Sequence, residues 1–243
     1  MFENIIIKTN QIIRKGWLKS IYNGSGGMGI TLEKLLDVET NTLEIPDFNE
    51  IEIKTKKINT NGYISLFSAT PDSFLFEIRR IHQYYGYPDR INKNFKVFNM
   101  SFTANDKVYI GKNLYGTLKI DNTEHKVVLV ILDKHGNIID SNCSWSFELL
   151  AQKINRKLKT LFLVHGQQKV LDNQIYFKYL DYSCYVIKGF NHFINCLENG
   201  YIRVSFKIGL IRSGPKTGQI CNHGTSFDIK ESQIEALYNK IRC

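Results

Sequence analysis

Two carboxylates and a lysine lie close together in the stretch from residue 45 to residue 57. Apolar and charged residues alternate in its second half, which predicts a strand with Glu52 and Lys54 on one face and isoleucines facing a core on the other. Asp47 follows a proline, which cannot donate to a sheet ladder, so we expect a preceding strand or turn to deliver it to the same end of the sheet. The spacing therefore predicts that Asp47, Glu52 and Lys54 converge.

These three side chains suit metal-assisted hydrolysis of a phosphodiester. Mg²⁺ prefers oxygen ligands, so one or two carboxylates and the phosphate oxygens of a substrate complete its coordination shell. The metal lowers the pKa of bound water, and a lysine ammonium orients the nucleophile or stabilises the charge that develops in the transition state. The alternative is a half-buried strand whose charged face meets water, because such short patterns recur by chance.

Length, charge and cysteine content limit the class of protein. The 243 residues are enough for one large domain or two packed lobes, and the net charge of +9 favours a polyanionic partner but also suits a soluble basic protein. The five cysteines are odd in number and contain no C-x-x-C pair, so we expect reduced thiols and neither a disulfide framework nor a zinc site. The longest apolar run, Val127 to Leu132, is too short to span a membrane, and we expect a cytoplasmic protein.

The segments before the charged strand supply one more candidate carboxylate. Apolar spacing predicts an amphipathic helix from Asn10 to Tyr22, and the glycine-rich residues 23–29 that follow are expected to turn sharply, approach a ligand or act as a linker. Their match to G-x-G-x-x-G does not indicate a dinucleotide site, because a helix rather than a strand precedes it. A short helix at 31–36 then carries Glu33, either on the surface or aimed at the metal site or Lys54.

The segments after the charged strand alternate between strand and helix patterns, which predicts a mixed α/β fold. Lys56, Lys57, Arg79 and Arg80 are candidate phosphate contacts in this region, although solvated charges are the more usual outcome for any one of them. We expect strands at 62–68, 127–132, 160–164, 175–182, 185–187 and 201–210, and helices at 73–85, 146–157, 191–197 and 231–242.

A polar stretch from residue 212 to residue 227 combines glycines and a proline with side chains that donate hydrogen bonds. Arg212, Lys216, Asn222 and His223 are of the types that read base edges in a major groove. We expect a long loop here, of the kind that is usually functional or disordered. The alternative for His223 is a structural histidine.

The order of these pieces resembles the MvaI/BcnI-like restriction endonucleases, within the PD-(D/E)xK nuclease group that also holds MutH-like enzymes. The matching features cover both ends of the chain and are the glycine-rich lead-in to 31–36, Pro46-Asp47, Glu52-Ile53-Lys54, 66–71, 80–88, Gly214-Pro215-Lys216, Asn222-His223-Gly224 and 234–238. Asp37 and Glu50 depart from the pattern, because they stand where we expect glycine.

The resemblance implies a type II restriction endonuclease that acts on double-stranded DNA with Mg²⁺, for which Mn²⁺ substitutes. It implies a mixed-sheet PD-(D/E)xK core with a DNA-recognition lobe, in a two-lobed monomer that clasps the duplex and needs no protein partner. We expect the catalytic lobe at 1–155 and the recognition lobe at 156–243. The target is expected to be a short pseudo-palindromic CC/GG site with a variable central pair, cut strand by strand, and a cognate DNA methyltransferase is implied in the host.

By residue match, the resemblance also implies roles for the site residues. Asp47 and Glu52 bind the metal with the carbonyl of Ile53, Lys54 positions the water, and Glu33 supports the site from its helix. The side chains expected to contact DNA are Lys56, Lys57, Ser68, Arg79, Arg212, Lys216, Asn222 and His223.

Three other functions remain open from the sequence. A MutH-like strand nickase or a junction resolvase would use the same chemistry and differ in its products. A DNA-binding protein without catalysis would bind without metal and leave DNA intact. A structural protein with incidental positive charge would show binding that does not depend on salt, unlike phosphate contacts.

Overall fold

The computed structural model covers all 243 residues and describes residues 2–22, 24, 26–38, 50–58, 60, 62–72, 77–212 and 214–243. The chain divides into two compact units: unit 1 is Met1–Ile64, Lys153–Gly189 and Ile234–Cys243, and unit 2 is Ser65–Gln152 and Phe190–Gln233. This differs from the single boundary expected between residues 155 and 156. The reason is that strands from three separate stretches of sequence build the sheet of unit 1.

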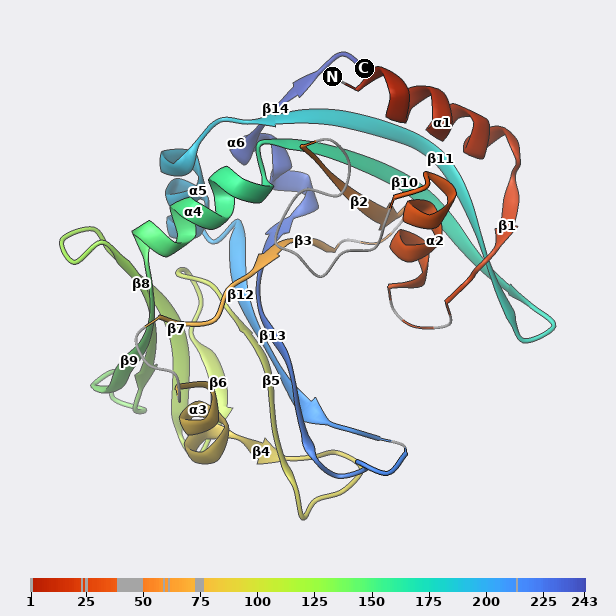
Figure 1. The fold of residues 1–243 in the computed structure, drawn as a ribbon. Coiled ribbons are helices and arrows are strands. Elements are labelled where there is room, and N and C mark those ends of the chain that lie inside the picture. Colours follow the sequence, from red (N-terminus) through yellow and green to blue (C-terminus); the bar gives the residue numbers. More distant parts are fainter. Residues whose placement is uncertain are drawn as a thin grey trace. The chain divides into compact units, whose positions relative to one another are not determined.

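A mixed sheet forms the centre of unit 1 (Figure 1). Its strand order is β1-β11-β10-β2, and β14 also pairs with β11. β10 and β2 run parallel, whereas β11 is antiparallel to β1, β10 and β14. The strands are β1 (Trp17–Lys19), β2 (Ile51–Lys57), β10 (Thr160–Leu171), β11 (Gln174–Ile187) and β14 (Tyr238–Ile241).

The two faces of this sheet carry different residues. Helices α1 (Glu3–Arg14) and α2 (Gly27–Leu35) pack on the face that carries Ile51 and Ile53. The members of this core, besides the two isoleucines, are Phe2, Ile5, Ile12, Met28, Leu32, Leu36, Val38, Phe162, Val164, Phe177, Tyr179 and Cys184. On the other face, the strand register places Glu52, Leu161 and Tyr185 in one row.

Unit 2 contains two sheets and an aromatic core. The strand orders are β3-β13-β12-β5-β4 and β6-β7-β8-β9. Trp145 is fully buried, packs against the rings of Phe206 and Phe227, and donates its indole N–H to the Ala69 carbonyl at 3.0 Å. The strands are β3 (Tyr63–Ser68), β4 (Tyr87–Pro88), β5 (Lys96–Phe102), β6 (Val108–Gly111), β7 (Leu114–Asp121), β8 (Lys126–Leu132), β9 (Ile138–Ser146), β12 (Ile202–Leu210) and β13 (Ile220–Lys230).

The helices that remain are short and connect or cap these sheets. α3 (Glu77–Tyr85) and α5 (Phe190–Glu198) belong to unit 2. α4 (Phe147–Lys157) begins in unit 2 and ends in unit 1. The 3₁₀ turn η1 (Glu231–Gln233) is the last part of unit 2, and α6 (Ile234–Leu237) follows it in unit 1. None of the helices within the described residues is both long and apolar enough to cross a membrane.

The expected mixed α/β fold is confirmed, and so is the strand at 51–57 that carries the candidate site. The alternative of a charged face that meets water does not hold for Glu52. Glu52 is fully buried, because residues from α4 and from the C-terminal segment lie over this face.

The N-terminal expectations need two corrections. The helix expected at residues 10–22 is α1, which starts at Glu3 and ends at Arg14, and residues 17–19 form β1 instead. Gly16 separates the two with φ of 71°, a conformation that glycine adopts without steric cost. In the glycine-rich stretch, Gly27 and Gly29 lie in the first turn of α2 rather than in a linker.

The C-terminal expectations differ more. The long loop expected at 212–227 is shorter, because β13 starts at Ile220 and pairs with β12. The helix expected at 231–242 ends at Leu237, and the residues after it form β14 at the edge of β11. Cys184 and Cys243 form a disulfide that closes this edge, so the expectation of five reduced thiols is wrong for this pair.

Candidate functional site

Strand β2 brings Glu52 and Lys54 together. The two side chains share a face because they are two positions apart, and the Lys54 ammonium donates a hydrogen bond to the Glu52 carboxylate. Glu52 is 0% exposed, whereas a quarter of the Lys54 side chain reaches solvent. A buried carboxylate needs a charged or hydrogen-bonded partner, and the partly exposed ammonium of Lys54 supplies one.

A second lysine, which the sequence did not indicate, reaches the same carboxylate. Lys157 is the last residue of α4, and its Nζ lies 3.4 Å from Oε1 of Glu52. Lys157 and Glu52 are far apart in sequence, so no local pattern links them. The signal that could have found Lys157 is its place directly before β10, because β10 runs parallel to β2 and begins beside Ile51.

Tyr238 closes the buried side of this site. Its ring packs against Tyr185 with the centroids 6.1 Å apart, and Tyr185 lies in the same row of the sheet as Glu52. Within the described residues, the buried Tyr238 hydroxyl has no hydrogen-bond partner. Burial and the negative charge of Glu52 raise the pKa of Tyr238 well above its usual range. Tyr238 and Tyr185 therefore form a buried aromatic side of the site, where electrostatic interactions with Glu52 are screened less than in water.

Glu33 lies beside the same strand. A Cβ placed on Gly29 would be 3.8 Å from Oε1 of Glu33 and 3.5 Å from Oγ1 of Thr55, so the Glu33 carboxylate lies near the Thr55 side of β2. Burial and the charge of Glu33 raise the pKa of Tyr179, which belongs to the core on that side. The register of β2 places Thr55 on the face opposite Glu52 and Lys54.

The expected metal ligands are only partly described. Asp47 lies outside the described residues, whereas Glu52 and Ile53 are both buried in β2. In the part of the chain that the structure describes, no group of three or more His, Cys, Asp or Glu side chains is arranged to hold a metal. A carboxylate and a backbone carbonyl are hard oxygen donors, so the residues present fit Mg²⁺ or Mn²⁺ and do not fit a thiophilic metal.

The lysines that follow on β2 differ in exposure. Lys56 is only 9% exposed, and its Nζ donates to the Tyr63 carbonyl at 3.5 Å. Lys57 is exposed. The structure therefore favours Lys57 over Lys56 as a surface contact, because Lys56 holds the connection to β3.

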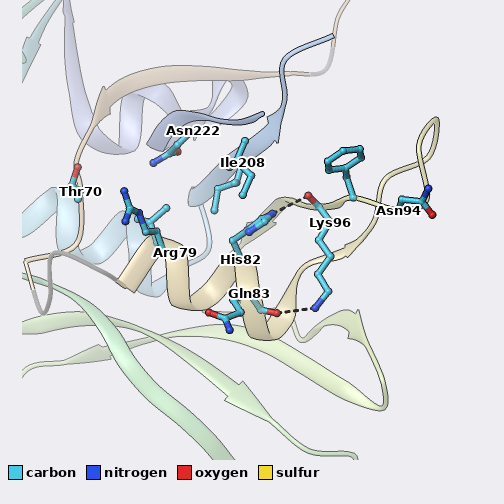
Figure 2. Close-up of a pocket in the computed structure, with 11 residues that line it drawn as sticks. Thr70, Arg79, His82, Gln83, Asn94, Lys96, Ile208 and Asn222 are labelled. Carbon is cyan, nitrogen blue, oxygen red and sulfur yellow. Dashed lines mark hydrogen bonds between the residues drawn. The ribbon is translucent and has the colours of Figure 1, made fainter. Parts of the chain in front are cut away.

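Unit 2 contains an open cleft of about 950 Å³ between α3 and the β12–β13 hairpin (Figure 2). Arg79 and Asn222, both expected DNA contacts, line it, and in Figure 2 the Arg79 guanidinium points toward Asn222. The His82 ring bonds the Lys96 carbonyl at 2.8 Å, and the Lys96 ammonium donates to the Gln83 carbonyl at 2.9 Å. The other lining residues are Thr70, Ile78, Asn94, Phe95, Ile208 and Ile220.

Arg80, the neighbour of Arg79, has an internal role. Its guanidinium pairs with Glu77 at 2.8 Å and with the buried Asp140, which also accepts a 2.7 Å hydrogen bond from the Tyr85 hydroxyl. Hydrogen bonds to Glu77 and Asp140 raise the pKa of Arg80, and burial raises the pKa of Tyr85 to about 12. This network fixes α3 on β9 and leaves Arg79 to face the cleft.

Arg212 is also paired within unit 2. Its two terminal nitrogens donate to the Asp89 carboxylate at 2.7 and 2.5 Å, and Asp89 is only 3% exposed. Hydrogen bonds from Arg212 and from the backbone N–H of Asn92 hold the pKa of Asp89 well below its usual range. An arginine held in this fork is oriented, and it keeps N–H donors for a further acceptor.

The other expected contacts lie on the β12–β13 hairpin or next to it. Lys216 is exposed in the turn of the hairpin, and the exposed His223 places its Nδ1 3.9 Å from Sγ of Cys221. Asn222 accepts a 2.9 Å hydrogen bond from the Gly224 backbone N–H. Ser68 lies beside the same glycine, because its Oγ would be 3.7 Å from a Cβ at Gly224. The structure therefore gathers Ser68, Lys216, Asn222 and His223 on one hairpin and its neighbouring strand.

Comparison with known proteins gives the family of the chain. The model of the MvaI/BcnI restriction endonuclease family matches residues 6–238. The chain is similar to the solved structure of restriction endonuclease MvaI with its cognate DNA substrate, with a TM-score of 0.90 and 26% identity over 98% of this chain and 97% of that chain. For MvaI in the absence of DNA, the TM-score is 0.62 at 26% identity, over 99% and 96% of the two chains.

No curated protein matches the chain. The family match is independent of such a relative, because the family model spans nearly the whole sequence, including β2 with its carboxylate and lysine and the hairpin of unit 2. This chain therefore belongs to the MvaI/BcnI restriction endonuclease family.

Proposed function

We propose that this site-specific endonuclease is a Mg²⁺-dependent type II enzyme that hydrolyses phosphodiester bonds in double-stranded DNA. The observation that carries the proposal is the fully buried Glu52 under the ammonium of Lys54 on β2. Burying a carboxylate costs free energy, and a charged group that is kept in a protein at such a cost is a candidate for function. Family membership gives this pair its chemical class.

The residues that would hold the metal are Glu52, the Ile53 carbonyl and Asp47. Oxygen donors of this kind suit Mg²⁺, and Mn²⁺ is expected to substitute. The ion, when bound, would lower the pKa of a coordinated water and neutralise charge on the phosphate. Glu33 would support β2 from the side of Thr55.

Lys54 has the central role in the reaction. Its ammonium already lies at the carboxylate that would hold the metal, and its partial exposure leaves it in reach of water and substrate. From this position it would orient the attacking water and stabilise the negative charge that develops on the phosphate oxygens. The buried apolar surroundings would strengthen this interaction, because charges are screened less there than in water.

Unit 2 would provide contacts to the DNA. The described residues that line its cleft include cationic and amide side chains and no Asp or Glu, and such donors fit phosphates and base edges. We expect Arg79 and Lys57 to contact the backbone, and Arg212, Lys216, Asn222, His223 and Ser68 to lie near the bases. The solved DNA complex of MvaI, to which this chain is similar, supports double-stranded DNA as the partner.

We further propose a short pseudo-palindromic CC/GG target with a variable central pair. The enzyme would act in the cytoplasm as a monomer that needs no protein partner, and it would cut the two strands one after the other at the site on β2. A cognate DNA methyltransferase would protect the host DNA.

The direct test is to incubate the purified protein with a plasmid of known sequence, with Mg²⁺ or with EDTA, beside a Lys54→Ala variant. We expect discrete fragments that require both Mg²⁺ and Lys54, and the mapped ends give the target and the cut position. Nicked circles that never become linear would instead indicate a strand nickase. An intact plasmid under every condition, with DNA binding retained, would contradict catalysis.

A further inference from the structure

The Glu52 carboxylate receives two lysine ammonium groups on the same oxygen. Lys54 donates to Oε1 from the same strand, and Lys157 lies 3.4 Å from Oε1 at the end of α4. Both lysines are about a quarter exposed, whereas the carboxylate is completely buried. Two lysines from different elements therefore converge on one oxygen of a buried carboxylate.

The position of Lys157 is not explained by the helix that carries it. A basic side chain in the last turn of a helix interacts favourably with the helix dipole. Arg156, in the same turn of α4, is exposed and already places a positive charge there. Interaction with the dipole does not require Lys157 to reach back over the sheet to a buried carboxylate, so its contact with Glu52 is a separate feature.

We propose that Lys157 is a positioning residue that holds the Glu52 carboxylate in place while Lys54 engages the attacking water. This inference rests on the proposed function, in which Lys54 must turn part of its hydrogen-bonding capacity from Glu52 to the water. A buried carboxylate that loses its partner pays a large desolvation cost and loses the contact that fixes its orientation. Lys157 is anchored on a different element from Lys54, so it holds Glu52 independently of what Lys54 does.

The test uses two variants of Lys157 and one matched control. Lys157→Met keeps the aliphatic stem and removes the charge, and Lys157→Arg keeps the charge. Lys159→Met removes the same charge two residues further on, where the side chain is exposed. The measured quantities are the single-turnover cleavage rate at saturating Mg²⁺, the DNA dissociation constant in EDTA, and the melting temperature of the metal-free protein.

We expect Lys157→Met to lower the cleavage rate roughly 10- to 100-fold, the usual effect of losing a group that orients a metal ligand. The DNA dissociation constant should change less than about threefold, because Lys157 acts through Glu52 and not through phosphate. Lys157→Arg should cleave at least about tenfold faster than Lys157→Met, because it restores the ion pair. Lys159→Met should remain within about twofold of the unmodified protein in both measurements.

A melting experiment without metal or DNA tests the contact independently of catalysis. Lys157→Met should lower the melting temperature by a few degrees in the unmodified protein. In a Glu52→Gln background the same change should have less than half of that effect, because the charge that Lys157 serves is absent. Equal losses in both backgrounds would show that Lys157 does not act through Glu52 and would overturn the proposal.

The outcomes separate this inference from the proposed function. If the unmodified protein cleaves DNA and Lys157→Met cleaves at the same rate, the positioning role is wrong and the nuclease stands. If DNA affinity falls as much as the rate, Lys157 is a phosphate contact and the proposal is again wrong. If the unmodified protein does not cleave at all, the proposed function fails, and the melting cycle still decides whether Lys157 holds Glu52.

Discussion

The candidate site of unit 1 and the cleft of unit 2 differ in how their charged groups are arranged. In unit 1, the charged groups of the site are paired with one another, and the buried Glu52 is held by Lys54 and Lys157. In the cleft of unit 2, the described lining residues include cationic, amide and apolar side chains and no Asp or Glu, and Arg79 is one of them (Figure 2). A site for chemistry must be organised before substrate arrives, whereas a site for recognition leaves donors for its partner to satisfy.

Within unit 2, the same comparison separates three arginines. Arg80 is enclosed by Glu77 and Asp140, and Arg212 is held in a fork by Asp89. Arg79 faces the cleft. Because Arg79 lines the cleft, we expect it to carry more of the sequence-independent affinity for DNA than Arg80 and Arg212.

The largest expected effect is on the chemistry of unit 1. Glu52→Gln and Lys54→Ala should each lower the single-turnover cleavage rate at least about 100-fold, because each removes a group that acts on the metal or on the developing charge. DNA affinity in EDTA should change less than about threefold. Lys57→Ala, on the same strand but exposed, should show the reverse pattern, with weaker binding and a nearly unchanged rate at saturation. If all three variants lost the same cleavage rate, Glu52 and Lys54 would not differ from an exposed residue of the same strand, and the assignment of the site would be wrong.

A smaller effect is expected on affinity through unit 2. Arg79→Ala should weaken binding to specific and non-specific DNA by about the same factor and reduce the salt slope of log K by about 1, as loss of one phosphate contact does. Lys134→Ala removes the same charge from the exposed hairpin between β8 and β9 and serves as the control. The comparison would be wrong if the two variants gave the same slope.

The Asp89–Arg212 pair predicts a dependence of stability on pH. The pKa of Asp89 is lowered in the folded chain, so its ion pair contributes fully above the ordinary aspartate pKa and is lost only as the pH falls through the lowered value. Asp89→Asn should therefore lower the melting temperature by a constant amount from pH 8 to pH 5. The difference between the two proteins should shrink below about pH 4. A difference that grew with acidity would contradict this assignment.

The smallest effect concerns the two departures from the family pattern. Asp37 and Glu50, which stand where we expect glycine, adopt φ values of 58° and 70°, the region that favours glycine. Glu50→Gly should raise the free energy of unfolding by at most about 1 kcal/mol and the melting temperature by about 2 °C, without changing cleavage. Asp37→Gly should gain less, because Asp37 also pairs with Lys8 at 3.2 Å. A lower melting temperature for Glu50→Gly would show that the side chain, not the backbone, governs this turn.

The sequence pattern predicted the part of the site that lies within one strand. Alternation over residues 51–57 predicted β2 and the shared face of Glu52 and Lys54, because strand geometry fixes both. The burial of that face was not predictable, because Lys157 and Tyr238, which lie near Glu52, are distant from it in the sequence. The positions of Glu52 and Lys54 follow from the strand, whereas their environment follows from tertiary structure.

The C-terminal segment shows how tertiary contacts override a local pattern. Apolar residues at 234, 237, 238 and 241 have helical spacing, yet residues 238–241 form β14. The reason is that the edge of β11 offers backbone partners and Cys243 bonds to Cys184. In the same way, the polar residues from Ile220 onward were predicted as a loop but extend β13 along β12. Polar composition indicates exposure, and it does not by itself exclude a strand.

The most direct test of the division between chemistry and recognition is DNA binding by Lys54→Ala. Its affinity for the target mapped with the unmodified protein is compared with its affinity for a scrambled duplex, in the presence of Mg²⁺. We predict that the variant keeps its preference for the target within about threefold while leaving the DNA uncut. Loss of that preference, or continued cleavage, would contradict the account, because Lys54 would then serve recognition or be dispensable for the chemistry.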